Sequence, residues 1–390
     1  MIVLNQVGQG TYWRAFHLAR QLVQKGQAVT LMATSHHNRS GIIVHDQEGV
    51  TLVETPDLLH GSLRSGWDLW NTINRLSWLH GRKFDLVHAF ESRPTVLIPA
   101  LYLARRRGIP LVMDWCDWFG KGGSVEERPN SLVRTLLRPV ETFFEERFRT
   151  QADGTTVICS LLHNKAQLLG VPQDQILDLP NGSDTQHLQS LPLASARLKI
   201  GLSSNDFVAG YVGRIFKRDA ELMAKAFDLV GNEIPEFKMV IVGHYPYDIR
   251  RLVNRPENLI LSGYVDTAQL NTYLAACDLF WLPLSDTNAN RGRFPLKLTD
   301  YMAVGRPVVA TEVGDVAKVL TDQSFGLLSR PEPEDFATQT LNLFRNPDLR
   351  LGMGAEARRL AETQFAWDHL ATQLLDLYMT VISERAGGSR

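Results

Sequence analysis

Residues 293–311 include side chains that could bind a phosphorylated or hydroxyl-rich ligand. Their apolar spacing predicts a short helix over residues 297–304, ended by Gly305 and Pro307, and then a buried strand over residues 308–310. The N-terminus of such a helix offers unpaired N–H groups and a partial positive charge. Asp300 on this helix could accept hydrogen bonds from both hydroxyls of a ribose. A solvated helix with an ordinary surface aspartate is the alternative.

A glycine turn with a cationic cluster follows the apolar run at residues 208–212. Gly213 would let the backbone come close to a ligand, and Arg214 with Lys217 or Arg218 could neutralise a diphosphate. A solvated basic turn is the alternative. A weaker glycine turn at residues 7–12 follows the first predicted strand. It lacks a complete G-x-G-x-x-G, so a tight turn without a ligand is as plausible as a sugar or phosphate contact.

Further candidates follow predicted strands of the first half, and open α/β sheets bind ligands at such strand ends. His88 ends one strand, and Asp114, Asp117 and Trp118 follow another. The carboxylates could bind a hydroxyl group of a substrate or act as a base, and the tryptophan could stack on a sugar ring. A core histidine, a helix cap and a core aromatic residue are the alternatives.

These motifs resemble the retaining family-four glycosyltransferases, which have the GT-B fold. The resemblance is carried by Asp300, Met302, Ala303, Gly305 and Pro307 with the strand that follows, which match the signature that holds the ribose of a nucleotide sugar. The first glutamate of that signature falls on Gly292, so the carboxylate expected to hold the donor sugar is absent. Lys297, in a Pro-Leu-Lys run, would place a cation near the phosphates.

The resemblance also implies roles for other residues. Arg214 with Lys217 or Arg218 would hold the departing diphosphate, and Asp117 lies next to Cys116, where the family often has a histidine. The remaining donor contacts that it implies are Gly8, Gly10, Arg14, Gly213, Gly243, Tyr264 and Val265. Residues 181–184 resemble the family's linker between domains, and residues 365–367 resemble the start of its closing helix.

The 390 residues alternate short apolar runs with amphipathic helices, which predicts two doubly wound α/β domains. We expect a Rossmann-like acceptor-side domain at residues 1–184 and a nucleotide-sugar domain at residues 185–365. Residues 366–390 would form a helix returning to the first domain and a flexible tail. The resemblance implies that the two domains face each other across a cleft.

Composition narrows the class of protein. A net charge of −1, from 41 basic and 42 acidic residues, argues against a nucleic-acid partner. Three widely spaced cysteines predict neither a disulfide framework nor a metal site, which favours a cytoplasmic protein. The N-terminus lacks the basic region of a signal peptide, and no apolar stretch is long enough for a membrane span.

A peripheral membrane contact is the remaining possibility. Residues 131–149 combine leucines, phenylalanines and arginines, a composition typical of an interfacial helix, with Arg134 and Arg138 placed to contact anionic head groups. Glu141, Glu145 and Glu146 argue against this, and Pro139 should kink or divide the helix. A buried helix beside the acceptor is the alternative.

The predicted function is retaining transfer of a sugar from a nucleoside diphosphate sugar to an acceptor hydroxyl on a glycan, a lipid-linked acceptor or a small molecule. The resemblance implies that the leaving phosphate helps to take the acceptor proton, so we assign no nucleophile. We expect no metal and no cofactor, because side-chain cations and helix N-termini can carry the charge of the leaving group. A sugar-nucleotide epimerase of the same fold and a non-catalytic nucleotide-sugar-binding subunit are the alternatives.

Overall fold

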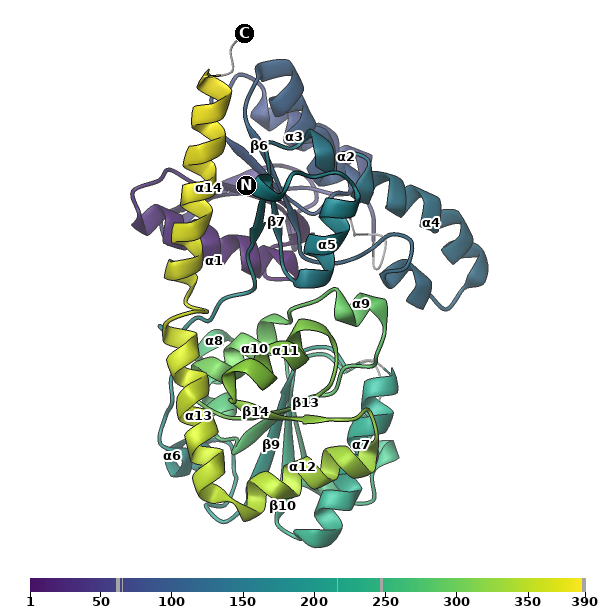
Figure 1. Cartoon of the computed structure of the whole chain (residues 1–390), viewed down its shortest axis with the longest axis vertical. Coiled ribbons are helices and arrows are strands. Elements are labelled where there is room, and N and C mark those ends of the chain that lie inside the picture. Colours follow the sequence, from purple (N-terminus) through teal and green to yellow (C-terminus); the bar gives the residue numbers. More distant parts are fainter. Residues whose placement is uncertain (61–63, 65, 216, 246–247, 388–390) are drawn as a thin grey trace. The chain divides into compact units, whose positions relative to one another are not determined.

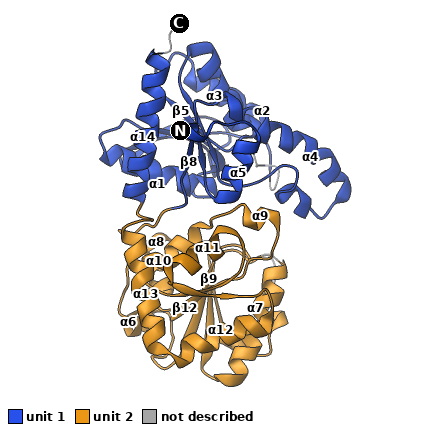
Figure 2. Ribbon diagram, viewed as in Figure 1, with its two compact units in different colours: residues 1–181, 367–390 blue, residues 182–366 orange. Residues whose placement is uncertain are grey.

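The computed structural model describes residues 1–60, 64, 66–215, 217–245 and 248–387 (Figure 1). The chain divides into two compact units, unit 1 comprising Met1–Asn181 with Trp367–Arg390 and unit 2 comprising Gly182–Ala366 (Figure 2). The boundaries therefore lie at Asn181 and Ala366, where the sequence analysis placed them at residues 184 and 365.

Unit 1 is built on one twisted sheet with the strand order β3-β4-β2-β1-β5-β6-β7-β8. Its strands are β1 (Ile2–Gln6), β2 (Thr30–Thr34), β3 (Ile43–Gln47), β4 (Val50–Thr55), β5 (Val87–Phe90), β6 (Leu111–Trp115), β7 (Gly154–Val157) and β8 (Ile176–Asp178). All neighbouring pairs are parallel except β3 with β4. The strands predicted at residues 2–4, 28–32, 51–54, 86–89, 111–113 and 154–158 are present, while β3 and β8 were not predicted. Four of the five β3 residues are exposed, and β8 is a three-residue edge strand, so neither carries a buried apolar pattern.

The helices of unit 1 are α1 (Thr11–Gln24), α2 (Leu69–Leu79), α3 (Pro94–Arg107), α4 (Ser131–Glu146), α5 (Ser160–Leu168) and α14 (Trp367–Gly387). The prediction that the C-terminal helix returns to the first domain is confirmed, since α14 packs along α1. The Trp367 ring stacks on His17, with centroids 5.3 Å apart, and Lys25 pairs with Asp368 at 2.6 Å. The expected division of α4 at Pro139 is wrong, because α4 is one helix with this proline inside it.

Unit 2 is a fully parallel sheet with the order β11-β10-β9-β12-β13-β14. Its strands are β9 (Phe207–Val212), β10 (Phe237–Val242), β11 (Leu259–Gly263), β12 (Leu279–Leu282), β13 (Val308–Thr311) and β14 (Gly326–Ser329). Its helices are α6 (Leu193–Lys199), α7 (Lys217–Glu233), α8 (Thr267–Ala275), α9 (Asn288–Arg291), α10 (Leu296–Ala303), α11 (Gly314–Gln323), α12 (Pro333–Arg345) and α13 (Pro347–Glu362).

Both sheets are doubly wound, so each has a point where the strand order reverses. In unit 2 this point lies between β9 and β12, and in unit 1 it lies between β1 and β5. Each sheet is covered by helices, and its buried strands are rich in aliphatic and aromatic residues, as in the core around Phe237, Trp281 and Phe336 of unit 2. Ligands of such sheets bind at the carboxyl ends of the strands, next to the reversal.

Candidate functional site

The strands β9, β10 and β11 each end at or lead into a glycine at the carboxyl end of the sheet, so the backbone there carries no side chain of its own. We call these three strand ends the strand edge of unit 2. Gly213, Gly243 and Gly263 all have positive φ, at 103°, 121° and 71°. The Gly213 N–H donates to the Val242 carbonyl at 2.8 Å, and the Gly243 N–H donates to the Gly263 carbonyl at 2.9 Å. A Cβ on Gly243 would lie 3.0 Å from the Gly213 carbonyl oxygen. Glycine is therefore required at Gly243 by both conformation and space.

Lys297 lies beside this edge. A Cβ on Gly213 would be 3.3 Å from the Lys297 Nζ, so the ammonium group lies next to the glycine turn. Lys297 donates to the Tyr211 hydroxyl at 2.8 Å, and its Nζ lies 4.1 Å from the centre of the Tyr211 ring. Burial lowers the pKa of Lys297 to about 8. The cation is thus held in place at the strand edge rather than extended into solvent.

Asp300 follows Lys297 by one turn of α10. Burial, together with the nearby Asp184 carboxylate, raises the pKa of Asp300 to about 7. Among the residues that the structure describes, none donates a hydrogen bond to the Asp300 carboxylate or forms an ion pair with it. A largely buried carboxylate without a donor is an acceptor available to a ligand.

Helix α10 is anchored to both the sheet and the linker, which fixes Lys297 and Asp300. The Tyr301 ring stacks on Phe280 with centroids 4.0 Å apart, and its hydroxyl accepts from the Val212 N–H at 2.9 Å. On the linker side, Ser183 Oγ donates to the Thr299 carbonyl at 2.8 Å. These bonds explain why Asp184 of the linker lies close enough to act on Asp300.

The cationic cluster of unit 2 lies in the turn from β9 to α7. Arg214, Lys217 and Arg218 are all exposed, and Lys217 lies 4.0 Å from Glu221. Phe216, inside this turn, lies outside the described residues. The sequence analysis missed Asp219, a buried residue in the first turn of α7 that accepts from Ser285 at 2.9 Å and acts electrostatically on Lys297. An acidic residue in the first turn of a helix was the available signal.

Two other predicted positions of unit 2 differ in character. Tyr264 is exposed, and its ring stacks over His244 with a 6.2 Å centroid separation, while Val265 is partly buried. Gly292 is the C-cap of α9, with φ −83°, and its N–H donates to the Asn288 carbonyl at 2.9 Å. The position where the signature has its first glutamate is thus an ordinary helix end without a side chain.

In unit 1, Arg14 and Asp114 belong to the core, which corrects the ligand-contact roles expected for them. Their side chains form a two-pronged ion pair at 2.9 and 3.0 Å, and both are almost fully buried. Arg14 also donates to the Leu179 and Pro180 carbonyls. The Arg14 guanidinium holds the pKa of Asp114 below its usual range despite the burial. This pair therefore joins α1, β6 and the chain after β8.

His88 is also a core residue, as the alternative interpretation had it. Its Nδ1 lies 2.6 Å from the Tyr378 hydroxyl of α14, and its Nε2 lies 3.3 Å from Thr156 Oγ1. Burial lowers the pKa of His88 to about 3, so the imidazole is neutral at physiological pH. His88 fastens α14 to the sheet instead of lying at an acceptor.

The glycine turn of unit 1 is tight and exposed. Gly8 and Gly10 have φ of 77° and 54°, and the Thr11 N–H and hydroxyl donate to Asn5 Oδ1 at 2.9 and 2.6 Å. A Cβ on Gly10 would lie 2.7 Å from that same oxygen. Glycine at this position therefore leaves room for Asn5 to accept the two hydrogen bonds that Thr11 donates at the start of α1.

A buried acid near Asp117 was not predicted from the sequence. Glu91 directly follows β5, is fully buried and has a φ of 78°, a conformation that non-glycine residues rarely adopt. Its Oε1 accepts from Cys116 Sγ at 2.6 Å, and its Oε2 has no partner among the described residues. Burial and the charge of Asp117 raise the pKa of Glu91. Trp118 packs under Lys165, whose Nζ is 4.9 Å from the ring centre.

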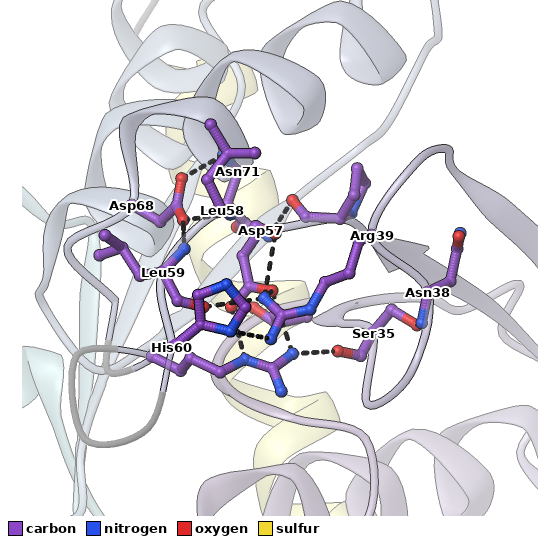
Figure 3. Close-up of polar contacts among 12 residues, drawn as sticks. Ser35, Asn38, Arg39, Asp57, Leu58, Leu59, His60, Asp68 and Asn71 are labelled. Carbon is purple, nitrogen blue, oxygen red and sulfur yellow. Dashed lines mark hydrogen bonds and ion pairs between the residues drawn. The ribbon is translucent and has the colours of Figure 1, made fainter.

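A polar network ties the loops after β2 and β4 to the start of α2 (Figure 3). Arg39 donates to Asp57 at 2.5 Å and to the Leu59 carbonyl at 2.8 Å. Asp68 accepts from the N–H groups of Leu58, Leu59 and Asn71. Apart from the buried Asn71 Oδ1, which has no partner among the described residues, these polar groups satisfy one another, so the network serves to hold the loops.

No group of three or more His, Cys, Asp or Glu side chains in the described part of the chain is arranged to hold a metal ion. Within the same residues, no helix has both the length and the apolar character to cross a membrane.

Comparison with known proteins identifies the family. A model described as "Glycosyl transferase 4-like domain" matches residues 8–182, and one described as "Glycosyl transferases group 1" matches residues 206–346. The D-inositol 3-phosphate glycosyltransferase of Paenarthrobacter aurescens is 24% identical over 96% of this chain and 93% of the relative. The phosphatidyl-myo-inositol mannosyltransferase of Mycobacterium tuberculosis is 25% identical over 79% of this chain and 77% of the relative.

Solved structures share the fold over nearly the whole length. Sucrose-phosphate synthase of Thermosynechococcus elongatus has a TM-score of 0.73 at 17% identity, covering 98% of each chain. HepE of Anabaena, solved in complex with UDP-glucose, has a TM-score of 0.70 at 15% identity, covering 97% of this chain and 99% of that one. With its two doubly wound units, this chain belongs to the family-four type of GT-B glycosyltransferases, enzymes that transfer a sugar from a nucleotide sugar.

Proposed function

We propose that unit 2 binds a nucleoside diphosphate sugar at the carboxyl edge of β9–β11 and that its sugar is transferred with retention to an acceptor hydroxyl. The Asp300 carboxylate carries this proposal, because it is largely buried and accepts no hydrogen bond from the described residues. A ribose diol would supply the two donors that this carboxylate lacks. Gly213 and Gly243 leave room for the phosphates, and Lys297 lies beside them.

The leaving diphosphate needs positive charge, and side chains of this chain can supply it. Lys297, Arg214 and either Lys217 or Arg218 would stabilise the charge that develops as the glycosidic bond breaks. Asp117 of unit 1 would contact the acceptor hydroxyl. Arg14, Asp114 and His88 are excluded from direct roles by their engagement in the core of unit 1.

The names of the two relatives support a hydroxyl acceptor of a particular chemistry. One acts on D-inositol 3-phosphate and the other on phosphatidyl-myo-inositol. We propose an acceptor of the polyol class, carried on a lipid and reached from an anionic membrane surface. A cytoplasmic enzyme with a peripheral membrane contact would meet such an acceptor.

The diphosphate contact is tested with Arg214→Ala and the matched control Arg345→Ala, an exposed arginine of α12. A thermal-shift screen with UDP, GDP, ADP and TDP first identifies the nucleotide, because a ligand that binds the folded state raises its stability. Calorimetry should then show about 10- to 100-fold weaker binding to Arg214→Ala, from the loss of a charge-assisted bond of roughly 1.5–3 kcal/mol. Unchanged affinity in this variant contradicts the assignment.

The metal-free mechanism is tested by chelation. Transfer should continue at nearly the same rate in EDTA, because positively charged side chains do the work of a cation. Activity that disappears in EDTA and returns with Mn²⁺ or Mg²⁺ would overturn this part of the proposal.

A further inference from the structure

Helix α4 in unit 1 presents its apolar side outward. Leu132, Leu136, Val140 and Phe143 recur at the spacing that places residues on one face of a helix, and Leu132 and Phe143 are 67% and 51% exposed. We call these four residues the apolar stripe of α4. A surface helix of a globular protein normally turns such a stripe toward the core. The stripe of α4 therefore requires another explanation.

The acidic side of α4 is the side that holds it to unit 1. Glu141 is buried and pairs with Arg93 at 2.9 Å and with Arg128 at 3.1 Å. Glu145 is also buried and accepts from Trp115 Nε1 at 3.0 Å and from the Phe119 N–H at 2.7 Å. Glu141 and Glu145 thus point away from the apolar stripe, whereas Glu146 is only partly buried and pairs with Lys165. Because buried carboxylates need such partners, this orientation is specified by many bonds.

The two arginines expected to contact head groups, Arg134 and Arg138, contact Glu126 instead. Arg138 pairs with Glu126, and Arg134 Nη1 donates to the Glu126 carbonyl at 3.4 Å. Arg147, which follows α4, is exposed and shares the stripe face by helical spacing from Val140 and Phe143. The cation next to the stripe is therefore Arg147.

An open groove of about 570 Å³ adjoins the C-terminal end of the stripe. Its lining combines apolar Pro139, Phe143 and Leu169 with Arg138, Arg147 and one acid, Glu146, whose charge is offset by Lys165. Between residues 121 and 147, five basic but only three acidic side chains are not buried, so this surface carries a net positive charge in a chain whose total is −1. An apolar strip with basic neighbours matches the interface of an anionic bilayer.

We propose that α4 docks on an anionic lipid bilayer, with the apolar stripe inserted among the acyl chains near the head groups and Arg147 beside the lipid phosphates. The purpose of this docking, the presentation of a lipid-linked acceptor, rests on the proposed function. The vesicle-binding test of the docking does not depend on that function. A second copy of this chain would bring two basic surfaces together, so charge favours the bilayer.

The test compares the full chain with the variant Leu132→Gln/Leu136→Gln/Phe143→Gln. Leu198→Gln in unit 2, at an 80% exposed leucine, is the matched control. Sedimentation with vesicles of phosphatidylcholine containing phosphatidylglycerol should pellet the parent and the control. The triple variant should bind at least tenfold more weakly, and high salt should weaken parent binding by screening Arg147.

Three further measurements give each failure a distinct signature. Circular dichroism and melting should be unchanged in the triple variant, because the substituted side chains are exposed. A parent that stays in the supernatant with these vesicles overturns the docking, as does a parent dimer in light scattering that the triple variant abolishes. Calorimetry with nucleotides reports on the proposed donor site separately. If the parent protein binds the vesicles but binds no nucleotide, the proposed function is contradicted and the docking of α4 stands.

Discussion

At the scale of single residues, burial separates the ionisable groups that serve the fold from those available to a ligand. Arg14, Asp114 and His88 are enclosed and fully partnered, so they stabilise unit 1. Asp300 has lost much of its water but has gained no donor, and its raised pKa expresses that cost. The same type of side chain, an aspartate, thus has two roles set by its partners.

Asp300→Asn should uncouple binding from stability. The pKa of Asp300 is about 7 in the folded chain, above the usual value near 4. Between these values the folded state holds a proton that the unfolded state has released, so this group lowers stability as pH rises from about 4 to 7. The amide removes that loss, and at pH 8 the variant should melt at the parent temperature or higher.

Nucleotide affinity should respond in the opposite direction. An amide oxygen accepts from a diol less well than a carboxylate does, so calorimetry at pH 8 should show roughly tenfold weaker binding, or about 1.4 kcal/mol. Parent affinity should also fall as the pH drops below 7 and the carboxyl protonates. Equal affinity in parent and variant across this range is the result that contradicts the ribose contact.

At the scale of elements, the strand edge that we propose as the donor site depends on how β9, β10 and β11 end. The Gly213 and Gly243 turns bond to neighbouring strands and lie in contact with each other. Helix α10 is tied to β9 through Tyr301 and to the linker through Thr299. The edge is therefore one assembled unit, and a change in a turn should reach the ligand.

Gly243→Ala should destabilise unit 2 and weaken nucleotide binding together. The φ of 121° is unfavourable for alanine, and the added Cβ would meet the Gly213 carbonyl at 3.0 Å. We expect a loss of about 1–3 kcal/mol in the free energy of unfolding. Gly352→Ala is the control, because that helical glycine of α13 has open space around its Cβ and should gain about 0.5–1 kcal/mol. Equal melting of the two variants would show that the Gly243 turn is not constrained.

At the scale of the whole molecule, the chain's last helix belongs to its first unit. α14 is fastened to unit 1 by His17, His88 and the backbone of β7, since a Cβ on Gly154 would lie 3.3 Å from Leu377. Unit 1 is therefore assembled from both ends of the sequence, whereas unit 2 is a continuous segment.

Ending the chain after Ala366 should destabilise unit 1 selectively. The truncation exposes apolar surface on α1 and β7 and leaves His88 without its Tyr378 partner. Calorimetry should show an earlier transition for unit 1 and little change in the transition of unit 2. A chain ending at Gly387 is the control. A truncated protein whose two transitions match those of the control would contradict the structural role of α14.

The sequence by itself determined the fold class and the family, and it located most residues of the strand edge that we propose as the donor site. Period-2 and period-3.6 patterns, with glycine and proline at the ends of elements, are local signals, and they located most strands of both sheets. Local signals also located Lys297, Asp300 and the Gly213 turn, because these residues are close together along the chain or follow a recognisable strand. Family membership followed from such short motifs.

Only the tertiary structure decided which charged residues are available. Arg14 meets Asp114 from 100 residues away, and Glu141 turns inward because Arg93 lies in the core beside it. No local pattern records such pairings, since they depend on which strands become neighbours in the sheet. The direction of the α4 stripe, which the sequence left open, and the burial of Glu91 were decided in the same way, because long-range ion pairs and hydrogen bonds fix the direction of a side chain more strongly than its own hydropathy does.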